Sequence, residues 1–209
     1  MSSETLETAR PQPQGRTSRK RSAVIEAARR VFAEKGYNAS MEQVAFEAEV
    51  SKQTIYNQFG SKEQLFNAMI DDRISEMVEP FVTAGPDADP RTVLTSIARL
   101  YHTKIIAPEN IKMMRALIAA PNAQPMLGQI YAHGPSRFIR TFADWLSAQD
   151  AAGRMKVPDP VLAAEHFASF TYGHLFMKRI YGVPAPFDAV DVERRVIYVV
   201  DAFLRAHAP

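Results

Sequence analysis

The stretch that decides the fold is residues 40–66, SMEQVAFEAEVSKQTIYNQFGSKEQLF. Serine is a preferred helix N-cap, and a glutamine three residues later completes a capping box. Three serines of the stretch stand where a helix can begin, and glutamine follows two of them at that spacing: Ser40 with Gln43, Ser51, and Ser61 with Gln64. The pattern predicts three closely spaced helices, over 41–48, 52–58 and about 62–79.

The first two of these helices and the tight turn between them form a helix-turn-helix pattern. Apolar residues would pack the short second helix against the first and against Phe32: Val44, Ala45, Ala48, Val50, Ile55 and Phe59. Polar residues would then face outward: Lys52, Gln53, Thr54, Tyr56, Asn57 and Gln58. Side chains of this length reach phosphates and base edges in the major groove of DNA. Since 50–62 contains no acidic residue, this surface suits the DNA backbone.

Composition and charge agree with a soluble protein that has one basic segment. The chain has 209 residues, of which 46% are hydrophobic and 23% charged. Residues 16–62 hold nine Lys/Arg and five Asp/Glu, a balance of +4, whereas 1–15 and 63–209 each carry −1. An excess of positive charge confined to one segment favours a polyanionic partner there.

The remainder of the chain predicts further helices and no strand. We expect a disordered tail over 1–15 and a first helix that begins near residue 18 and stops at Gly36. Later helices are expected from Pro90 to Pro108 and over about 109–119, 130–152 (interrupted near Gly134–Pro135), 161–177 and 188–206. The run 196–200 has strand propensity by residue type, but it is assigned to a helix, because no other segment offers a strand partner and charged residues flank it at helix length. The fold class is therefore all-α, with about nine helices.

Residues 50–66, with Phe32–Tyr37 and Ser40–Ala45 before them, resemble the signature of the tetracycline-repressor (TetR) family of bacterial transcription regulators. The resemblance covers about 18–66. It implies that Thr54 contacts a base or phosphate, that Tyr56 and Lys62 contact phosphates, and that the basic start of the first helix, Arg16, Arg19, Lys20 and Arg21, lies near DNA. The implied DNA-binding residues are Arg19, Lys20, Ser51, Lys52, Gln53, Thr54, Tyr56, Asn57, Gln58 and Lys62.

Two residues depart from the family's pattern. Glu42 stands where many members carry an arginine or a polar base reader, so base reading would depend mainly on helix 52–58. Glu49 stands where the turn residue is often glycine, and a left-handed conformation is slightly strained for glutamate.

The C-terminal part is loosely similar to the AefR-like regulators, through Gly134–Arg137 and Asp159–Phe167. We expect a helix-turn-helix DNA-binding domain over 16–62 and a helical ligand-binding and dimerisation domain over 63–209. An unknown small apolar effector would enter among Tyr101, Met113, Met114, Phe138, Phe142, Trp145, Phe170, His174 and Met177, although His174 also fits a core or interface position. Helices 161–177 and 188–206 would form a homodimer, with the small face Ala164, Ala168, Thr171 and Leu175 against the partner.

Several other classes of function find no support in the sequence. There is no cysteine, no phosphate-binding loop, no catalytic motif and no paired metal ligand among the five histidines, so we expect no enzyme, cofactor or metal. There is no signal peptide or membrane span, which predicts a cytoplasmic protein. The predicted function is a ligand-responsive repressor released from a palindromic double-stranded DNA operator. One alternative is a helical small-molecule-binding or enzymatic protein without specific DNA binding. Another is an activator, because the direction of regulation depends on where the operator lies.

Overall fold

The computed structural model describes residues 16–85, 87–121, 123–184 and 189–209, and these are helical without any strand. The all-α prediction is therefore confirmed, while the tail expected over 1–15 lies outside the described residues. The α-helices are α1 (Arg16–Lys35), α2 (Met41–Glu47), α3 (Lys52–Phe59), α4 (Lys62–Thr83), α5 (Pro90–Leu100), α6 (Pro108–Ile118), α7 (Ala123–His133), α8 (Pro135–Ala151), α9 (Pro160–Ile180) and α10 (Ala189–Ala206). A short 3-10 turn, Gly36–Asn38, follows α1, and a π-helical turn, Tyr101–Ile105, follows α5.

Helices α2, α3 and α4 begin at the three predicted serine caps. Ser40 and Gln43 form a complete capping box, and the hydroxyls of Ser51 and Ser61 each accept a backbone N–H of the helix that follows. Capping of this kind stabilises a helix start by about 1 kcal/mol, which matters most for α3 because eight residues do not hold a helix alone.

Helix α4 is longer than the predicted 62–79, because it continues through Pro80 to Thr83. A proline inside a helix removes one backbone hydrogen bond, so another interaction must offset the loss. Phe81 supplies it: its buried ring stacks on Phe142 with centroids 4.7 Å apart. The extra turn thus anchors α4 in the C-terminal core.

The helix expected up to Pro108 changes to a π-turn at Tyr101. The interruption expected near Gly134–Pro135 is confirmed, since α7 ends at His133 and α8 begins at Pro135, but α7 begins earlier than expected, at Ala123. Gly134 is tightly packed, since a Cβ there would lie 3.1 Å from both the Ile130 carbonyl oxygen and the Ile70 side chain, and these neighbours would have to shift by a few tenths of an ångström. The close approach of α4 therefore fixes where α7 ends.

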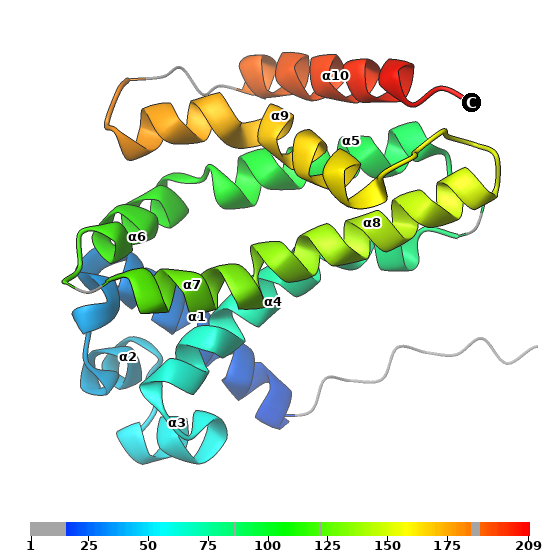
Figure 1. Ribbon diagram of the computed structural model, residues 1–209. Helices are drawn as coiled ribbons and strands as arrows, with labels where there is room; N and C mark the ends of the chain where they lie inside the picture. Colours follow the sequence, from blue (N-terminus) through cyan, green and yellow to red (C-terminus); the bar gives the residue numbers. More distant parts are fainter. Residues whose placement is uncertain (1–15, 86, 122, 185–188) are drawn as a thin grey trace, which may run out of the picture.

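Figure 1 shows α2 and α3 at one end of the molecule, and α9 and α10 together at the opposite end. Helix α4 runs between the two ends beside α8. A cluster of aromatic rings fills the C-terminal core between α4, α8, α9 and α10: Phe81, Phe138, Phe142, Trp145, Phe167 and Phe203. None of the described helices is long and apolar enough to cross a membrane.

The prediction that the small face of helix 161–177 meets a partner chain is wrong. Ala164, Ala168, Thr171 and Leu175 are all buried within their own chain. Helix α8 packs against α9, and small side chains allow the two helices to approach closely. The face of α9 left exposed carries larger side chains, among them Phe170 and Met177.

Candidate DNA interface and ligand cavity

Helix α3 is held on the rest of the N-terminal unit by two buried side chains, Ile55 and Phe59. The turn that leads into it has Glu49 at φ 53°, so the left-handed conformation expected there is confirmed. The hydroxyl of Ser51 accepts the backbone N–H of Thr54 at 3.1 Å and lies 2.8 Å from its hydroxyl. Turn, cap and two apolar anchors together fix which residues of α3 face solvent.

The exposed face of α3 carries Lys52, Gln53, Tyr56 and Asn57. The Gln53 amide donates a hydrogen bond to the Asn57 side-chain oxygen at 2.8 Å, so these two amides lie side by side one turn apart. Thr54 is half-buried, and the Oε1 atom of Gln58 is buried, which turns that side chain partly inward. The structure thus presents most, but not all, of the predicted contact residues of α3 to solvent.

Lys52 forms an ion pair with Glu42 of α2 and lies 5.7 Å from the ring centroid of Tyr56. The hydrogen bond from Lys52 lowers the pKa of the Glu42 carboxyl, and the same bond raises the pKa of Lys52. Both groups are charged at neutral pH. Glu42, which departs from the family's pattern, therefore forms an ion pair with Lys52, the first residue of α3.

More cations surround this face. The ammonium of Lys62, at the start of α4, lies 4.5 Å from the ring centroid of Tyr37, and burial lowers its pKa. The guanidinium of Arg21 lies 4.7 Å from the ring centroid of Phe59, which places the beginning of α1 beside α3. Arg19 and Lys20 are exposed in the same part of α1. Backbone amides at helix starts and nearby cations are groups that bind phosphates.

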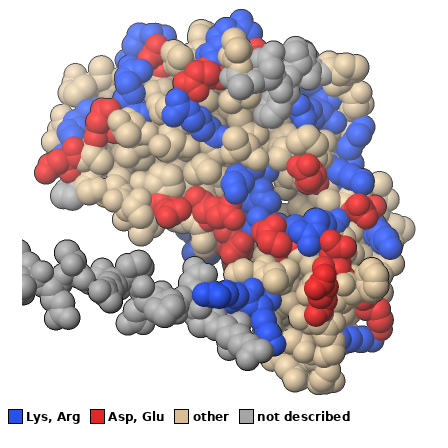
Figure 2. All heavy atoms as spheres, turned by 180° about the vertical axis from the view of Figure 1, so that it is seen from behind, with Lys and Arg blue, Asp and Glu red and all other residues tan. Residues whose placement is uncertain are grey.

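The N-terminal unit joins the rest of the chain through charged and close contacts. Figure 2 shows acidic and basic side chains gathered where the lower part of the molecule meets the upper part. The guanidinium of Arg29 in α1 lies 2.6 Å from a carboxylate oxygen of Asp72 and 3.6 Å from one of Glu76, both in α4. Glu76 also pairs with Lys104 of the π-turn at 2.5 Å. These pairs connect α1, α4 and the π-turn.

Gly36 marks a second joint, between the end of α1 and α6. Its φ is +65°, and a Cβ there would lie 3.2 Å from the Cβ of Ala116. Both residues are small where the backbones approach most closely. The end of α1 and helix α6 are therefore in direct contact at this point.

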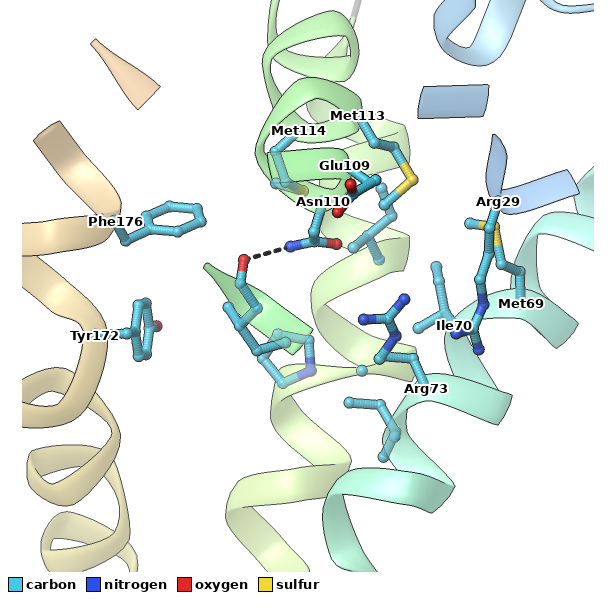
Figure 3. Close-up of a pocket in the computed structure, with 15 residues that line it drawn as sticks. Arg29, Met69, Ile70, Arg73, Glu109, Asn110, Met113, Met114, Tyr172 and Phe176 are labelled. Atoms are coloured by element: carbon cyan, nitrogen blue, oxygen red, sulfur yellow. Dashed lines mark hydrogen bonds between the residues drawn. The ribbon is translucent and has the colours of Figure 1, made fainter. Parts of the chain in front are cut away.

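A cavity of about 300 Å³ lies between α4, α6 and α9, close to these joints (Figure 3). Its wall is mostly apolar, with four polar or charged side chains reaching it: Arg29, Arg73, Glu109 and Asn110. The apolar wall includes Met69, Ile70, Ile74, Ile105, Met113, Met114, Ile130, Pro135, Tyr172 and Phe176. A concave apolar site with few polar groups is the usual form of a small-molecule site.

The predicted ligand residues fall into three groups. Met113 and Met114 line this cavity. Tyr101, Phe138, Phe142 and Trp145 are buried in the aromatic core, with Tyr101 stacked on Tyr172 at 5.2 Å. Phe170, His174 and Met177 lie exposed on the outer face of α9.

Sequence reasoning missed Arg29, Arg73, Tyr172 and Phe176 as cavity residues. Tyr172 and Phe176 stand four residues apart on one helix, a spacing that carries a usable signal. Arg29 and Arg73 carry no sequence signal that would place them at a cavity, because charged residues on amphipathic helices are expected to face solvent.

The outer faces of α9 and α10 carry large exposed apolar side chains. They are Leu162, Phe170 and Met177 of α9 and Val190, Ile197 and Tyr198 of α10. Several large exposed apolar side chains on two neighbouring helices are typical of a protein interface.

Two family models match the chain. One, described as bacterial regulatory proteins of the tetR family, matches residues 24–69, and the other, the C-terminal domain of AefR-like transcriptional repressors, matches residues 92–209. No curated protein matches this chain.

Solved structures match over nearly the whole length. A protein from Mesorhizobium loti MAFF303099, described as a putative TetR-family transcriptional regulator, is 27% identical to this chain. Its structure matches with a TM-score of 0.71 over 93% of this chain and 100% of that one. The flavonoid-responsive regulator FrrA is 30% identical, with a TM-score of 0.65 over 91% and 98%. A TetR-family regulator from Pseudomonas syringae pv. tomato str. DC3000 is 26% identical, with a TM-score of 0.64 over 92% and 98%.

Proposed function

Because the chain belongs to the TetR family and carries the C-terminal domain of AefR-like transcriptional repressors, we propose that it is a repressor released from a palindromic operator by a small molecule. Regulators of this family bind DNA operators and form dimers. The observation that carries the proposal is the capped, solvent-facing helix α3 with cations of α1 and α4 beside it. Since the proposed target is operator DNA, we place its action in the cytoplasm, and we propose binding rather than catalysis as its activity.

In this proposal residues 16–62 bind DNA, and residues 63–209 bind the effector and the second subunit. The dimer forms through the exposed apolar faces of α9 and α10, with twofold symmetry. The symmetry gives the two α3 helices two related half-sites in successive major grooves. Lys52, Gln53, Asn57 and Gln58 would read bases, whereas Tyr56, Lys62, Arg19 and Lys20 would contact phosphates.

The effector would act through the contacts of α1 with α4 and α6, which lie beside the cavity. A molecule between α4, α6 and α9 displaces α6 or α4, and both helices bear on α1. It weakens DNA binding only as far as it prefers the displaced arrangement, and a shift from 99:1 to 1:99 requires a preference of about 5.5 kcal/mol. FrrA is by its name responsive to flavonoids. Together with the cavity, that supports a small-molecule effector here.

The direct test is fluorescence anisotropy of the purified protein with DNA from just upstream of its own gene, at several salt concentrations. We expect preferential binding over unrelated DNA, in multiples of a dimer, with affinity that falls steeply as salt rises. Equal binding to both DNAs would place the operator elsewhere. Absence of binding at low salt, by folded protein freed of bound small molecules, would overturn the proposal.

Single substitutions in and beside α3 should separate positioning from base reading. Lys62→Ala is expected to weaken binding to all sequences alike and to reduce the salt slope by about 1. Gln53→Ala should instead change preference among operator variants, by about 1–3 kcal/mol at one base pair. The same anisotropy titrations against a set of single-base operator variants measure both effects. A Gln53→Ala protein with unchanged preference would remove that residue from base reading.

Glu42→Gln is expected to strengthen DNA binding. The change releases Lys52 from its ion pair and removes a negative charge from the surface that faces phosphates. We expect a gain of about two- to fivefold at moderate salt, the range of exposed charge effects, that shrinks as salt rises. Glu79→Gln is the matched control, since this exposed residue stands 17 positions beyond Lys62 on α4, about 25 Å away. Weaker binding by Glu42→Gln would mean that Glu42 itself contacts DNA or holds Lys52 in its productive position.

A further inference from the structure

The cavity is lined by a cation, Arg73, that forms no ion pair with any residue that the structure describes. Arg73 extends from α4 into the space faced by α6 and α9 (Figure 3). Among the described residues its guanidinium makes one hydrogen bond, to the backbone carbonyl oxygen of Lys104 at 3.0 Å, and no ion pair. A guanidinium carries five N–H donors in a planar fork, so most of them remain available toward the cavity.

The nearby carboxylates are already committed elsewhere. Asp72 and Glu76 bind Arg29, and Glu76 also binds Lys104. Burial lowers the pKa of Arg73, and the positive charge of Arg29 lowers it further, while the carboxylates of Glu76, Glu26 and Asp72 oppose the shift without reversing it. A half-buried cation beside a second cation is costly, and an anion brought into the cavity would relieve that cost.

The opposite side of the cavity is apolar and aromatic. Tyr172 and Phe176 of α9 face α6 with their rings edge to face, centroids 5.5 Å apart. Met113 and Met114 come from α6. Thioethers pack favourably against aromatic rings and adapt to irregular outlines. The volume, about 300 Å³, is at the low end for ligand sites, which favours a compact molecule over a long chain.

We propose that the effector is a small aromatic acid whose carboxylate pairs with Arg73 and whose ring lies between the two methionines of α6 and the two aromatic residues of α9. This rests on the proposed function, since it names the class of molecule that would occupy the regulatory cavity. The carboxylate fits the guanidinium fork with two parallel hydrogen bonds, which also orients the ring. Glu109 lies on the cavity wall but is exposed and makes no described ion pair with Arg73, so it acts only as a weak opposing charge.

The test is isothermal titration calorimetry of the full-length protein with three probes: 2-naphthoate, its neutral amide 2-naphthamide, and octanoate. We expect saturable binding of 2-naphthoate, at least about tenfold tighter than binding of 2-naphthamide, because only the acid makes the charge-assisted pair. Octanoate should bind more weakly than 2-naphthoate. Absence of 2-naphthoate binding up to about 1 mM, or equal binding of acid and amide, would overturn the proposal.

Two variants assign the effect to Arg73. Arg73→Gln should remove the preference for the acid over the amide. Glu109→Gln should instead strengthen acid binding severalfold, because it removes a like charge. Arg140→Gln is the control: Arg140 is exposed on α8 and donates to Ser136, so the preference should not change. An Arg73→Gln protein that folds by circular dichroism and still prefers the acid would overturn the proposal, as would weaker acid binding by Glu109→Gln.

The anisotropy assay separates this inference from the proposed function. A protein that binds its operator but shows no preference for the acid keeps the regulator function and loses the aromatic-acid assignment. A protein that binds 2-naphthoate through Arg73 but never binds DNA keeps the assignment of the cavity and loses the repressor function.

Discussion

Replacing Phe170 and Ile197 together by glutamate is expected to convert the protein into monomers and to remove tight operator binding. Phe170 is 72% exposed on α9 and Ile197 is 51% exposed on α10, at the centre of the proposed dimer face. In a twofold dimer each substitution occurs twice, so four carboxylates would be buried in an apolar contact. Charges of the same sign brought that close also repel one another.

The effect on DNA should be large because a dimer binds its two half-sites as one linked unit. A monomer loses the gain from linkage, which is about 10²- to 10⁴-fold for two joined binding modules. We expect the double variant to weaken specific binding by at least the lower figure, although α3 itself is unchanged. Sedimentation equilibrium gives the mass of the free protein, and the operator titration gives the affinity.

Val82→Glu is the matched control. Val82 is also 72% exposed, but it lies near the end of α4, beside α8 residues, and outside the proposed dimer face. This variant should remain dimeric with unchanged operator affinity. A double variant that stays dimeric would refute the α9–α10 interface, whereas a monomeric one with full affinity would refute the linkage between dimerisation and DNA binding.

Phe142→Ala is expected to lower the free energy of unfolding by about 3–5 kcal/mol. The Phe142 side chain is fully buried, and its ring contacts those of Phe81, Phe167 and Phe203, with centroids 4.7, 5.3 and 6.3 Å apart. Removal of the ring leaves a cavity between α4, α8, α9 and α10 that these aromatic neighbours refill only in part. Replacing a residue that only lines the ligand cavity by alanine would lower the free energy of unfolding much less.

Urea unfolding at a fixed protein concentration measures the change, since a dimer's stability depends on concentration. Phe46→Ala provides the comparison, because Phe46 is 87% exposed on α2 and its loss should change stability by no more than about 0.5 kcal/mol. A loss below about 1 kcal/mol for Phe142→Ala would mean that this ring faces open space rather than the core.

Local signals made the N-terminal unit predictable. The serine caps of α2, α3 and α4 and the left-handed turn at Glu49 all depend on residues a few positions apart, so the sequence contains everything that determines them. The exposed face of α3 follows from the same pattern, because its two anchors, Ile55 and Phe59, are four residues apart.

The cavity depends on packing between distant segments, which local pattern does not specify. Arg73 stands on an amphipathic helix where a charge predicts solvent, and only the placement of α6 and α9 opposite α4 encloses it. Helix α9 is apolar on nearly every side, so its sequence did not decide which face meets its own chain. The larger α8 contact buried the small residues and left Phe170 outside.

The π-turn Tyr101–Ile105 makes the cavity sensitive to the number of residues in the chain as well as to their identity. A π-turn contains one residue more than the α-helical turn it replaces. Lys104 in this turn supplies two groups: its backbone carbonyl oxygen accepts a hydrogen bond from Arg73, and its ammonium pairs with Glu76. Deleting one residue would restore regular α-helix and rotate the following segment by about 100°, carrying both groups away from α4. A single-codon insertion or deletion in this turn would therefore change the response to the effector, even where the cavity residues of α4, α6 and α9 keep their identity.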